Sequence, residues 1–171
     1  MKLTSFEAIV EALNRAEVRF IVVGGIAVSA HGYGRNTEDK DLVIRLEPSE
    51  ITNAFAALQQ LGYQPRVPIT AAQFADADLR GPWIRDKGMR VLRFHSDVHR
   101  ETPIDLFISE PFDFEKEYES ALVQEIAPGL PVRTVRLEAL LQMKAAAGRT
   151  QDVADVDELN LLHGRKSSYD R

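Results

Sequence analysis

The stretch that decides the fold runs from an apolar segment into a glycine pair and then, beyond a polar loop, into a second apolar segment. It reads Val22-Val23-Gly24-Gly25, followed by Asp39-Lys40-Asp41-Leu42-Val43-Ile44. A third apolar segment, Ile104-Asp105-Leu106-Phe107-Ile108, carries one more acid. Short runs rich in β-branched and large apolar residues are typical of buried strands. We therefore expect a sheet that carries carboxylates on its strands.

The two acids of the second segment are predicted to lie side by side. Side chains alternate along a strand, so Asp39 and Asp41 project to one face while Lys40 points away. Two like charges at that separation repel each other unless a divalent cation or a shared proton compensates. Asp105 stands among apolar strand residues, so it is either paired or bound to the same ion. Oxygen ligands of this kind favour Mg²⁺ or Mn²⁺, and three acids can hold two such ions.

The glycine pair is the second part of the predicted site. Gly24-Gly25 follows a strand and precedes an expected short helix over residues 26–31. Bare backbone amides at such a place can bind phosphate groups, although a glycine pair also marks an ordinary tight turn. The glycine pair and the three acids together predict phosphoryl chemistry.

The surrounding chain predicts an α+β (mixed α/β) fold, with a mixed central sheet, helices before and after it, and two C-terminal helices. Residues 63–88 give no firm assignment beyond a possible short helix over 71–77. We expect a single domain over 1–171, with a catalytic core over about 18–110 and a helical part over about 111–163. The other expected helices are 5–16, 48–61, 111–119, 137–147 and 152–162; the expected strands are 19–23, 39–46, 89–94, 104–108 and 132–135, with 89–94 and 104–108 as an antiparallel pair.

Composition excludes several classes of site. The chain has 171 residues, no cysteine and a formal net charge of −5. Disulfides, thiolate zinc sites and cysteine nucleophiles are therefore excluded, and nucleic acid would need a local basic patch. Residues 80–100, with six basic residues against two acids, are the candidate patch, although a solvated surface is the simpler interpretation. His95 and His99 are four residues apart but lack the helix and glutamate of a zinc motif. With no apolar run long enough to cross a membrane and no secretion signal, we expect a cytoplasmic protein.

The order of a glycine pair, a D-x-D strand and a later single-aspartate strand resembles the nucleotidyltransferase superfamily, with its DNA polymerase β-like core. Within it, residues 24–42 most resemble the bacterial branch of AbiEii-type toxins and their uncharacterised relatives. The segment 137–144, followed by Arg149, Asp152 and Asp155, is similar to the K…R-x-x-D stretch of that branch. The resemblance covers roughly residues 18–163.

This resemblance assigns roles to individual residues. It implies that three residues are catalytic and bind Mg²⁺ or Mn²⁺, namely Asp39, Asp41 and Asp105, and that Asp105 also deprotonates or orients the acceptor. It implies that Gly24 and Gly25 contact a triphosphate that Lys144 approaches, although Lys144 is equally well read as a surface lysine. Arg35 and Thr37, in the loop before the acids, are candidate nucleotide contacts.

Two departures from the family pattern stand out. Many members have Gly-Ser where this chain has Gly24-Gly25, so a phosphate-binding hydroxyl is missing. Lys40 also replaces the usual apolar residue between the acids, which is harmless only if the strand is regular. We expect Arg149, Asp152 and Asp155 to form structural ion pairs that brace the site.

The function expected from these features is metal-dependent transfer of a nucleoside monophosphate from an NTP, such as ATP, to an acceptor hydroxyl, with release of pyrophosphate. The acceptor would be an RNA 3′ end such as tRNA, a protein or a small molecule, in a toxin–antitoxin-like setting with an antitoxin-like partner and no membrane. One alternative is a non-catalytic nucleotide- or protein-binding relative of the same fold. Another is a phosphate-ester hydrolase that uses the same carboxylates.

Overall fold

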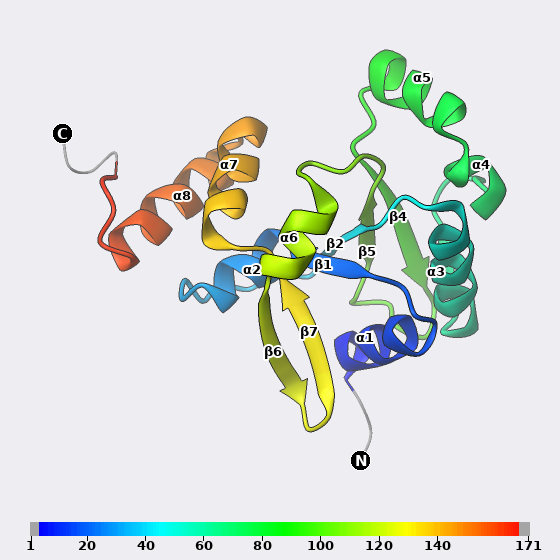
Figure 1. Ribbon diagram of the computed structural model, residues 1–171, viewed down its shortest axis with the longest axis horizontal. Helices are drawn as coiled ribbons and strands as arrows, with labels where there is room; N and C mark the ends of the chain where they lie inside the picture. The colour runs from blue at the N-terminus through cyan, green and yellow to red at the C-terminus, as the bar shows by residue number, and fades with distance from the viewer. Residues whose placement is uncertain (1–3, 168–171) are drawn as a thin grey trace.

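Most helices and strands lie where the apolar spacing predicts them. The computed structural model describes residues 4–167, in which eight helices surround one sheet (Figure 1). The helices are α1 (Ser5–Arg15), α2 (Gly24–Ala30), α3 (Pro48–Gln60), α4 (Ala71–Ala75), α5 (Ala77–Lys87), α6 (Phe114–Ser120), α7 (Leu137–Ala147) and α8 (Thr150–Leu162). The strands are β1 (Phe20–Val23), β2 (Lys40–Ile44), β3 (Tyr63–Pro65), β4 (Val91–Ser96), β5 (Ile104–Phe107), β6 (Leu122–Ala127) and β7 (Leu130–Thr134).

The sheet is mixed, as predicted. Its strand order is β3-β4-β5-β2-β1-β7-β6. β2 runs parallel to β5 and β1 runs parallel to β7, whereas the remaining neighbours are antiparallel. The predicted antiparallel pairing of residues 89–94 with 104–108 is confirmed by β4 and β5. This order places β2 and β5, the two strands that carry the candidate acids, next to each other in the middle of the sheet.

Each face of the sheet packs against its own set of helices. One face of β1 presents Phe20 and Val22 to a core shared with α1, α3 and α4. The other face presents Ile21 and Val23 to a core shared with α2, α6, α7 and α8. This alternation is the expected pattern of a strand buried on both sides. The first core covers one face of the two central strands, β2 and β5. Figure 1 shows α7 and α8 on the opposite side of the sheet from α3.

Three elements were not predicted, and each lacks a clear pattern. β3 is a three-residue edge strand that ends at Pro65. β6, at the other edge, has four exposed residues in a row, so no buried face marks it in the sequence. α5 contains Pro82 and buries none of its residues, and α2 begins at Gly24 rather than at residue 26. None of the helices over residues 4–167 is long and apolar enough to cross a membrane.

The core beneath the acid-bearing strands sets the first prediction. Phe94 of β4 is 1% exposed, and its ring centroid lies 5.1 Å from that of Phe55 on α3. Phe94→Ala should therefore lower the free energy of unfolding by about 3–5 kcal/mol, because it leaves a cavity. Urea unfolding measures the change. Val98→Ala, at a side chain that is 76% exposed, is the matched control and should change it by less than about 0.5 kcal/mol.

Candidate active site

Strand register brings the candidate acids into one line across the sheet. Val23 of β1 lies opposite Asp41 of β2, Asp41 lies beside Asp105 of β5, and Asp105 lies opposite Arg93 of β4. Because side chains alternate along each strand, these positions share the face of the sheet that α2, α7 and α8 cover. The sheet therefore places two carboxylates and a guanidinium next to one another.

Asp39, immediately before β2, joins this line through Arg93. The guanidinium donates from Nε to Oδ1 of Asp105 at 2.8 Å and from Nη2 to Oδ2 of Asp105 at 2.8 Å. The same Nη2 donates to Oδ2 of Asp39 at 2.9 Å. Two of the three predicted acids are thus held by one arginine. The ion pairs of Arg93 with Asp39 and Asp105 were not predicted from the sequence.

Lys40 does not enter the acid cluster. Its Nζ donates to the carbonyl oxygens of Glu38 at 2.9 Å and Thr37 at 3.3 Å. β2 shows no bulge here, since Lys40 pairs with Ile104 of β5 and Asp41 pairs with both Val23 of β1 and Asp105 of β5, and alternation along a regular strand directs Lys40 away from the face of Asp41. The ammonium therefore leaves the carboxylates of Asp39 and Asp41 accessible.

Asp41 is the acid that Arg93 does not contact. Burial, together with the neighbouring carboxylates of Asp105 and Asp39, raises the pKa of Asp41 to about 6. The positive charges of Lys144 and Arg149 act in the opposite direction on this pKa. The net effect of burial and of these charges favours the protonated form of the Asp41 carboxyl.

The glycine pair packs directly against the acids and their loop. A Cβ atom at Gly24, whose φ is +67°, would lie 2.0 Å from Oδ2 of Asp41. A Cβ atom at Gly25 would lie 2.7 Å from both Cβ and Oγ1 of Thr37. The Thr37 side chain therefore fills the space that a side chain at residue 25 would need. The hydroxyl of Thr37 therefore lies directly beside the backbone of Gly25.

Lys144 and Arg35 lie in a buried charge network rather than on the surface. Lys144 Nζ contacts Oδ1 of Asp152 at 3.1 Å and Oδ2 of Asp155 at 3.0 Å, and its side chain is 7% exposed. Arg35 donates from Nε and Nη2 to the two oxygens of Asp155, each at 2.9 Å. Although burial acts against it, the hydrogen bonds from Arg35 and Lys144 hold the pKa of Asp155 below its usual range.

This network joins the C-terminal helices to the loop before the acids. Asp155 of α8 contacts both Arg35 of that loop and Lys144 of α7. Arg149 and Asp152 form the i,i+3 ion pair that their spacing predicts, at 2.7 Å. The position of the loop that carries Thr37 and Asp39 therefore depends on α7 and α8.

The carboxylates fit a hard divalent cation in chemistry and charge. The raised pKa of Asp41 comes first from its burial and then from the carboxylates of Asp105 and Asp39, whose negative charge a cation would offset. As the side chains stand within residues 4–167, however, no three acidic or histidine side chains are arranged to hold a metal ion. The cation that Asp39 and Asp105 contact in this structure is the guanidinium of Arg93.

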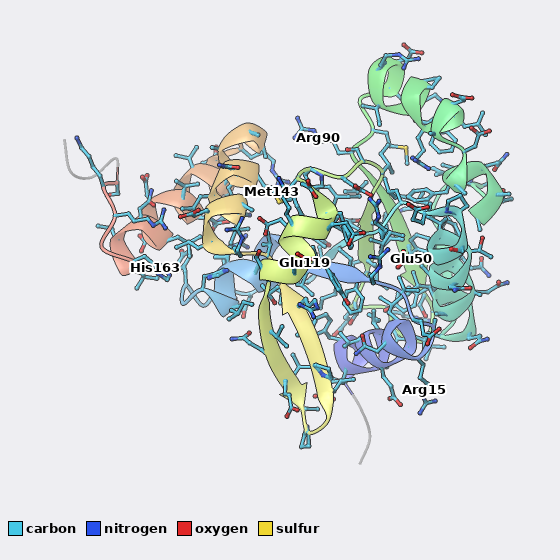
Figure 2. The ribbon with its side chains drawn as sticks, viewed as in Figure 1. Arg15, Glu50, Arg90, Glu119, Met143 and His163 are labelled. Carbon is cyan, nitrogen blue, oxygen red and sulfur yellow. The ribbon has the colours of Figure 1, made fainter. Side chains whose placement is uncertain are left out.

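The remaining charged candidates lie apart from the acids. His99 hydrogen-bonds Ser5 and stacks on Tyr63, whereas His95 is exposed, so the two do not form a pair. Of the basic residues between 80 and 100, Arg93 enters the site, and Arg90, labelled in Figure 2, projects into solvent. The signal for Arg93 was its place on a strand predicted to pair with the Asp105 strand, but the register needed to connect them was unknown.

The close packing of Gly24 predicts a sensitive position. Gly24→Ala should lower the free energy of unfolding by roughly 2 kcal/mol, because alanine is disfavoured at positive φ and its methyl group would displace the Asp41 carboxylate. Urea unfolding measures this. Gly34→Ala is the control, since nothing lies within 4 Å of a Cβ atom there. An equal loss in both variants would contradict the packing argument.

The raised pKa of Asp41 predicts a pH-dependent gain from neutralising it. The folded protein favours the protonated carboxyl, so stability falls as pH rises from about 4 to about 6 and the loss is complete above that range. Asp41→Asn should therefore raise the free energy of unfolding by about 2 kcal/mol at pH 7.5 and by little at pH 4. Thermal unfolding at the two pH values measures the difference. Asp86→Asn, at an exposed aspartate of α5, should show no such gain.

Comparisons with known proteins support the fold. No protein-family profile matches this chain, and no curated protein matches it in sequence.

Among solved structures, the antibiotic-resistance factor ANT(2'')-Ia aligns with a TM-score of 0.59 at 14% identity, over 91% of this chain and 80% of that one. A crystal structure of ANT(2'')-Ia with adenylyl-2''-tobramycin aligns with a TM-score of 0.55 at 13% identity, over 93% and 92%. The lincosamide antibiotic adenylyltransferase LnuA, bound to lincomycin, aligns with a TM-score of 0.57 at 13% identity, over 95% of this chain and 99% of that one. The chain therefore has the fold of ANT(2'')-Ia and LnuA.

Proposed function

We propose that this protein is a metal-dependent nucleotidyltransferase that transfers a nucleoside monophosphate from an NTP to an acceptor hydroxyl. The observation that carries the proposal is the line of Asp41 and Asp105, with Asp39 beside them, on one face of the sheet next to Gly24. Like-charged side chains converging in this way gain nothing for folding, so their placement favours a catalytic use. The structural similarity to the adenylyltransferase LnuA, and to ANT(2'')-Ia in complex with adenylyl-2''-tobramycin, makes ATP the first donor to test.

The three acids would hold Mg²⁺ or Mn²⁺. The bound ion supplies charge neutralisation at the triphosphate and lowers the pKa of the acceptor hydroxyl. The backbone at Gly24 and Gly25 and the hydroxyl of Thr37 would bind the triphosphate. Arg35 and Lys144 would add positive charge and fix the loop before the acids through Asp155.

Asp105 is the proposed proton acceptor. In the transfer, the acceptor oxygen forms a bond to the α-phosphorus while the bond from that phosphorus to the pyrophosphate oxygen breaks. The hydroxyl proton passes to the carboxylate of Asp105, and pyrophosphate leaves with the electron pair. Most of the rate enhancement would come from positioning and charge neutralisation.

The nature of the acceptor is the open part of the proposal. An RNA 3′ end such as tRNA, a protein side chain and a small molecule each offer a hydroxyl, and a toxin–antitoxin setting would add a cognate partner protein. ANT(2'')-Ia is an antibiotic-resistance factor, and LnuA is a lincosamide antibiotic adenylyltransferase. We therefore include antibiotic-sized hydroxyl compounds among the acceptors to test.

A non-catalytic nucleotide-binding relative is the second candidate. The observation that favours it is Arg93, which occupies both oxygens of Asp105 and one of Asp39. In that case the acids would serve as a fixed ion pair within the fold. The transfer assay that follows separates the two candidates.

Labelled NTPs test the proposed activity. The protein is incubated with each α-³²P-labelled NTP, Mg²⁺ or Mn²⁺ and total cell extract, and label is then measured in RNA, protein and small molecules. We expect label in one fraction, with Asp41→Asn and Asp105→Asn lowering transfer by about 100-fold or more because each removes a metal-binding charge. Asp86→Asn should transfer label at the rate of the wild type. No transfer under either metal by a folded wild type would favour the non-catalytic candidate.

A further inference from the structure

The guanidinium of Arg93 uses the same oxygens that a metal ion would need. It binds Oδ1 and Oδ2 of Asp105 and Oδ2 of Asp39, with distances of 2.8 to 2.9 Å. A bidentate contact of this kind is the strongest geometry that an arginine makes with a carboxylate. A divalent ion at these oxygens would also lie within a few ångströms of a like charge. Arg93 and a metal ion therefore cannot both occupy the acids as they stand.

The backbone of Arg93 is anchored, whereas its side chain is free to move away from the acids. The residues on either side of it, Leu92 and Phe94, are each 1% exposed and anchor β4 in the core of the opposite face. The Arg93 side chain itself is 36% exposed, and within residues 4–167 it forms ion pairs with Asp39 and Asp105 alone. Withdrawal of the guanidinium would therefore not disturb the core. The strand is fixed while its charged group is held only by the acids.

The neighbouring carboxylates explain why a positively charged side chain lies at this site. Asp105 is 8% exposed, and Asp41 lies beside it on the next strand. Without a positive charge nearby, the carboxylates of Asp41 and Asp105 would repel each other at a site that is largely shielded from water. Arg93 offsets that repulsion when no other cation is present.

We propose that Arg93 is a resident counter-ion of the acid cluster, which an incoming divalent cation must displace. This inference rests on the proposed role of Asp39, Asp41 and Asp105 as metal ligands, but not on the transfer of a nucleotide. The displaced guanidinium needs another anion, and a triphosphate bound beside Gly24 supplies one. The free metal ion therefore binds weakly, and metal and nucleotide bind together.

Binding of Mn²⁺ alone tests the exchange. Free Mn²⁺ is followed by electron paramagnetic resonance as the full-length protein is added, first without nucleotide. Arg93→Gln should bind Mn²⁺ at least tenfold more tightly than the wild type, because the competing charge is gone. Adding ATP should tighten Mn²⁺ binding by the wild type much more than binding by Arg93→Gln.

A neighbouring arginine provides the matched control. Arg66 follows β3, its backbone N–H donates to the carbonyl of Arg93, and its exposed side chain makes no ion pair within residues 4–167. Arg66→Gln removes the same charge from the adjacent strand without freeing a carboxylate. It should bind Mn²⁺ as the wild type does. A gain as large as that of Arg93→Gln would overturn the proposal, because it would show a general charge effect.

Thermal unfolding gives a second readout. In EDTA, Arg93→Gln should unfold at a lower temperature than the wild type, because the acids lose their counter-ion, and Mn²⁺ should restore more of the difference than it adds to the wild type. If Arg93→Gln does not fold, Arg93→Lys replaces it, since a single ammonium cannot hold both oxygens of Asp105 and should allow intermediate Mn²⁺ affinity.

The outcomes separate this inference from the proposed function. Tighter Mn²⁺ binding by the variant supports the inference even if no label is ever transferred. A folded Arg93→Gln, or a folded Arg93→Lys in its place, that binds Mn²⁺ no better than the wild type overturns it, even if the wild type transfers label. Tight binding of Mn²⁺ by the wild type without nucleotide also overturns it.

Discussion

Repulsion between carboxylates is the constraint around which this structure is arranged. The register of β2 against β5 sets Asp41 beside Asp105, and alternation adds Asp39 to the same face. The protein answers this crowding in two ways: a guanidinium from β4 holds two of the acids, and the third takes up a proton more readily than an ordinary aspartate. An ion pair and a proton are the two forms of compensation that the folded chain itself supplies.

Much of the centre of the sheet could be predicted from the sequence. The strands that carry Asp41 and Asp105 are short, apolar and clearly bounded, and their alternation decides which face each acid occupies. Helices with regular apolar spacing, such as α1 and α3, were equally legible. That Asp41 would lie near Asp105 was expected from these local patterns together with the family resemblance, because acids spread over residues 39–105 specify a meeting point only through a known fold.

What could not be predicted depends on partners distant in sequence. Arg93 faces Asp105 because of one particular register between β4 and β5, and a shift of one residue would have sent it to the other face. The sequence left Lys144 open between a triphosphate contact and a surface lysine, because its two acidic partners lie on the next helix, at Asp152 and Asp155. Thr37 gave no sign that it would fill the space beside Gly25. Cross-strand and cross-helix pairing decided all three.

The contacts of Asp155 link helix α8 to the loop that precedes the acids. Helix α8 contributes no acid to the sheet, yet this one fully buried carboxylate grips Arg35 ahead of the acids and Lys144 on α7 at the same time. Helix α8 therefore holds the loop before the acids in place through one side chain. A displacement of α8 would pass through Asp155 to Arg35, and so to the segment that carries Thr37 and Asp39, even though α8 carries none of the three candidate acids.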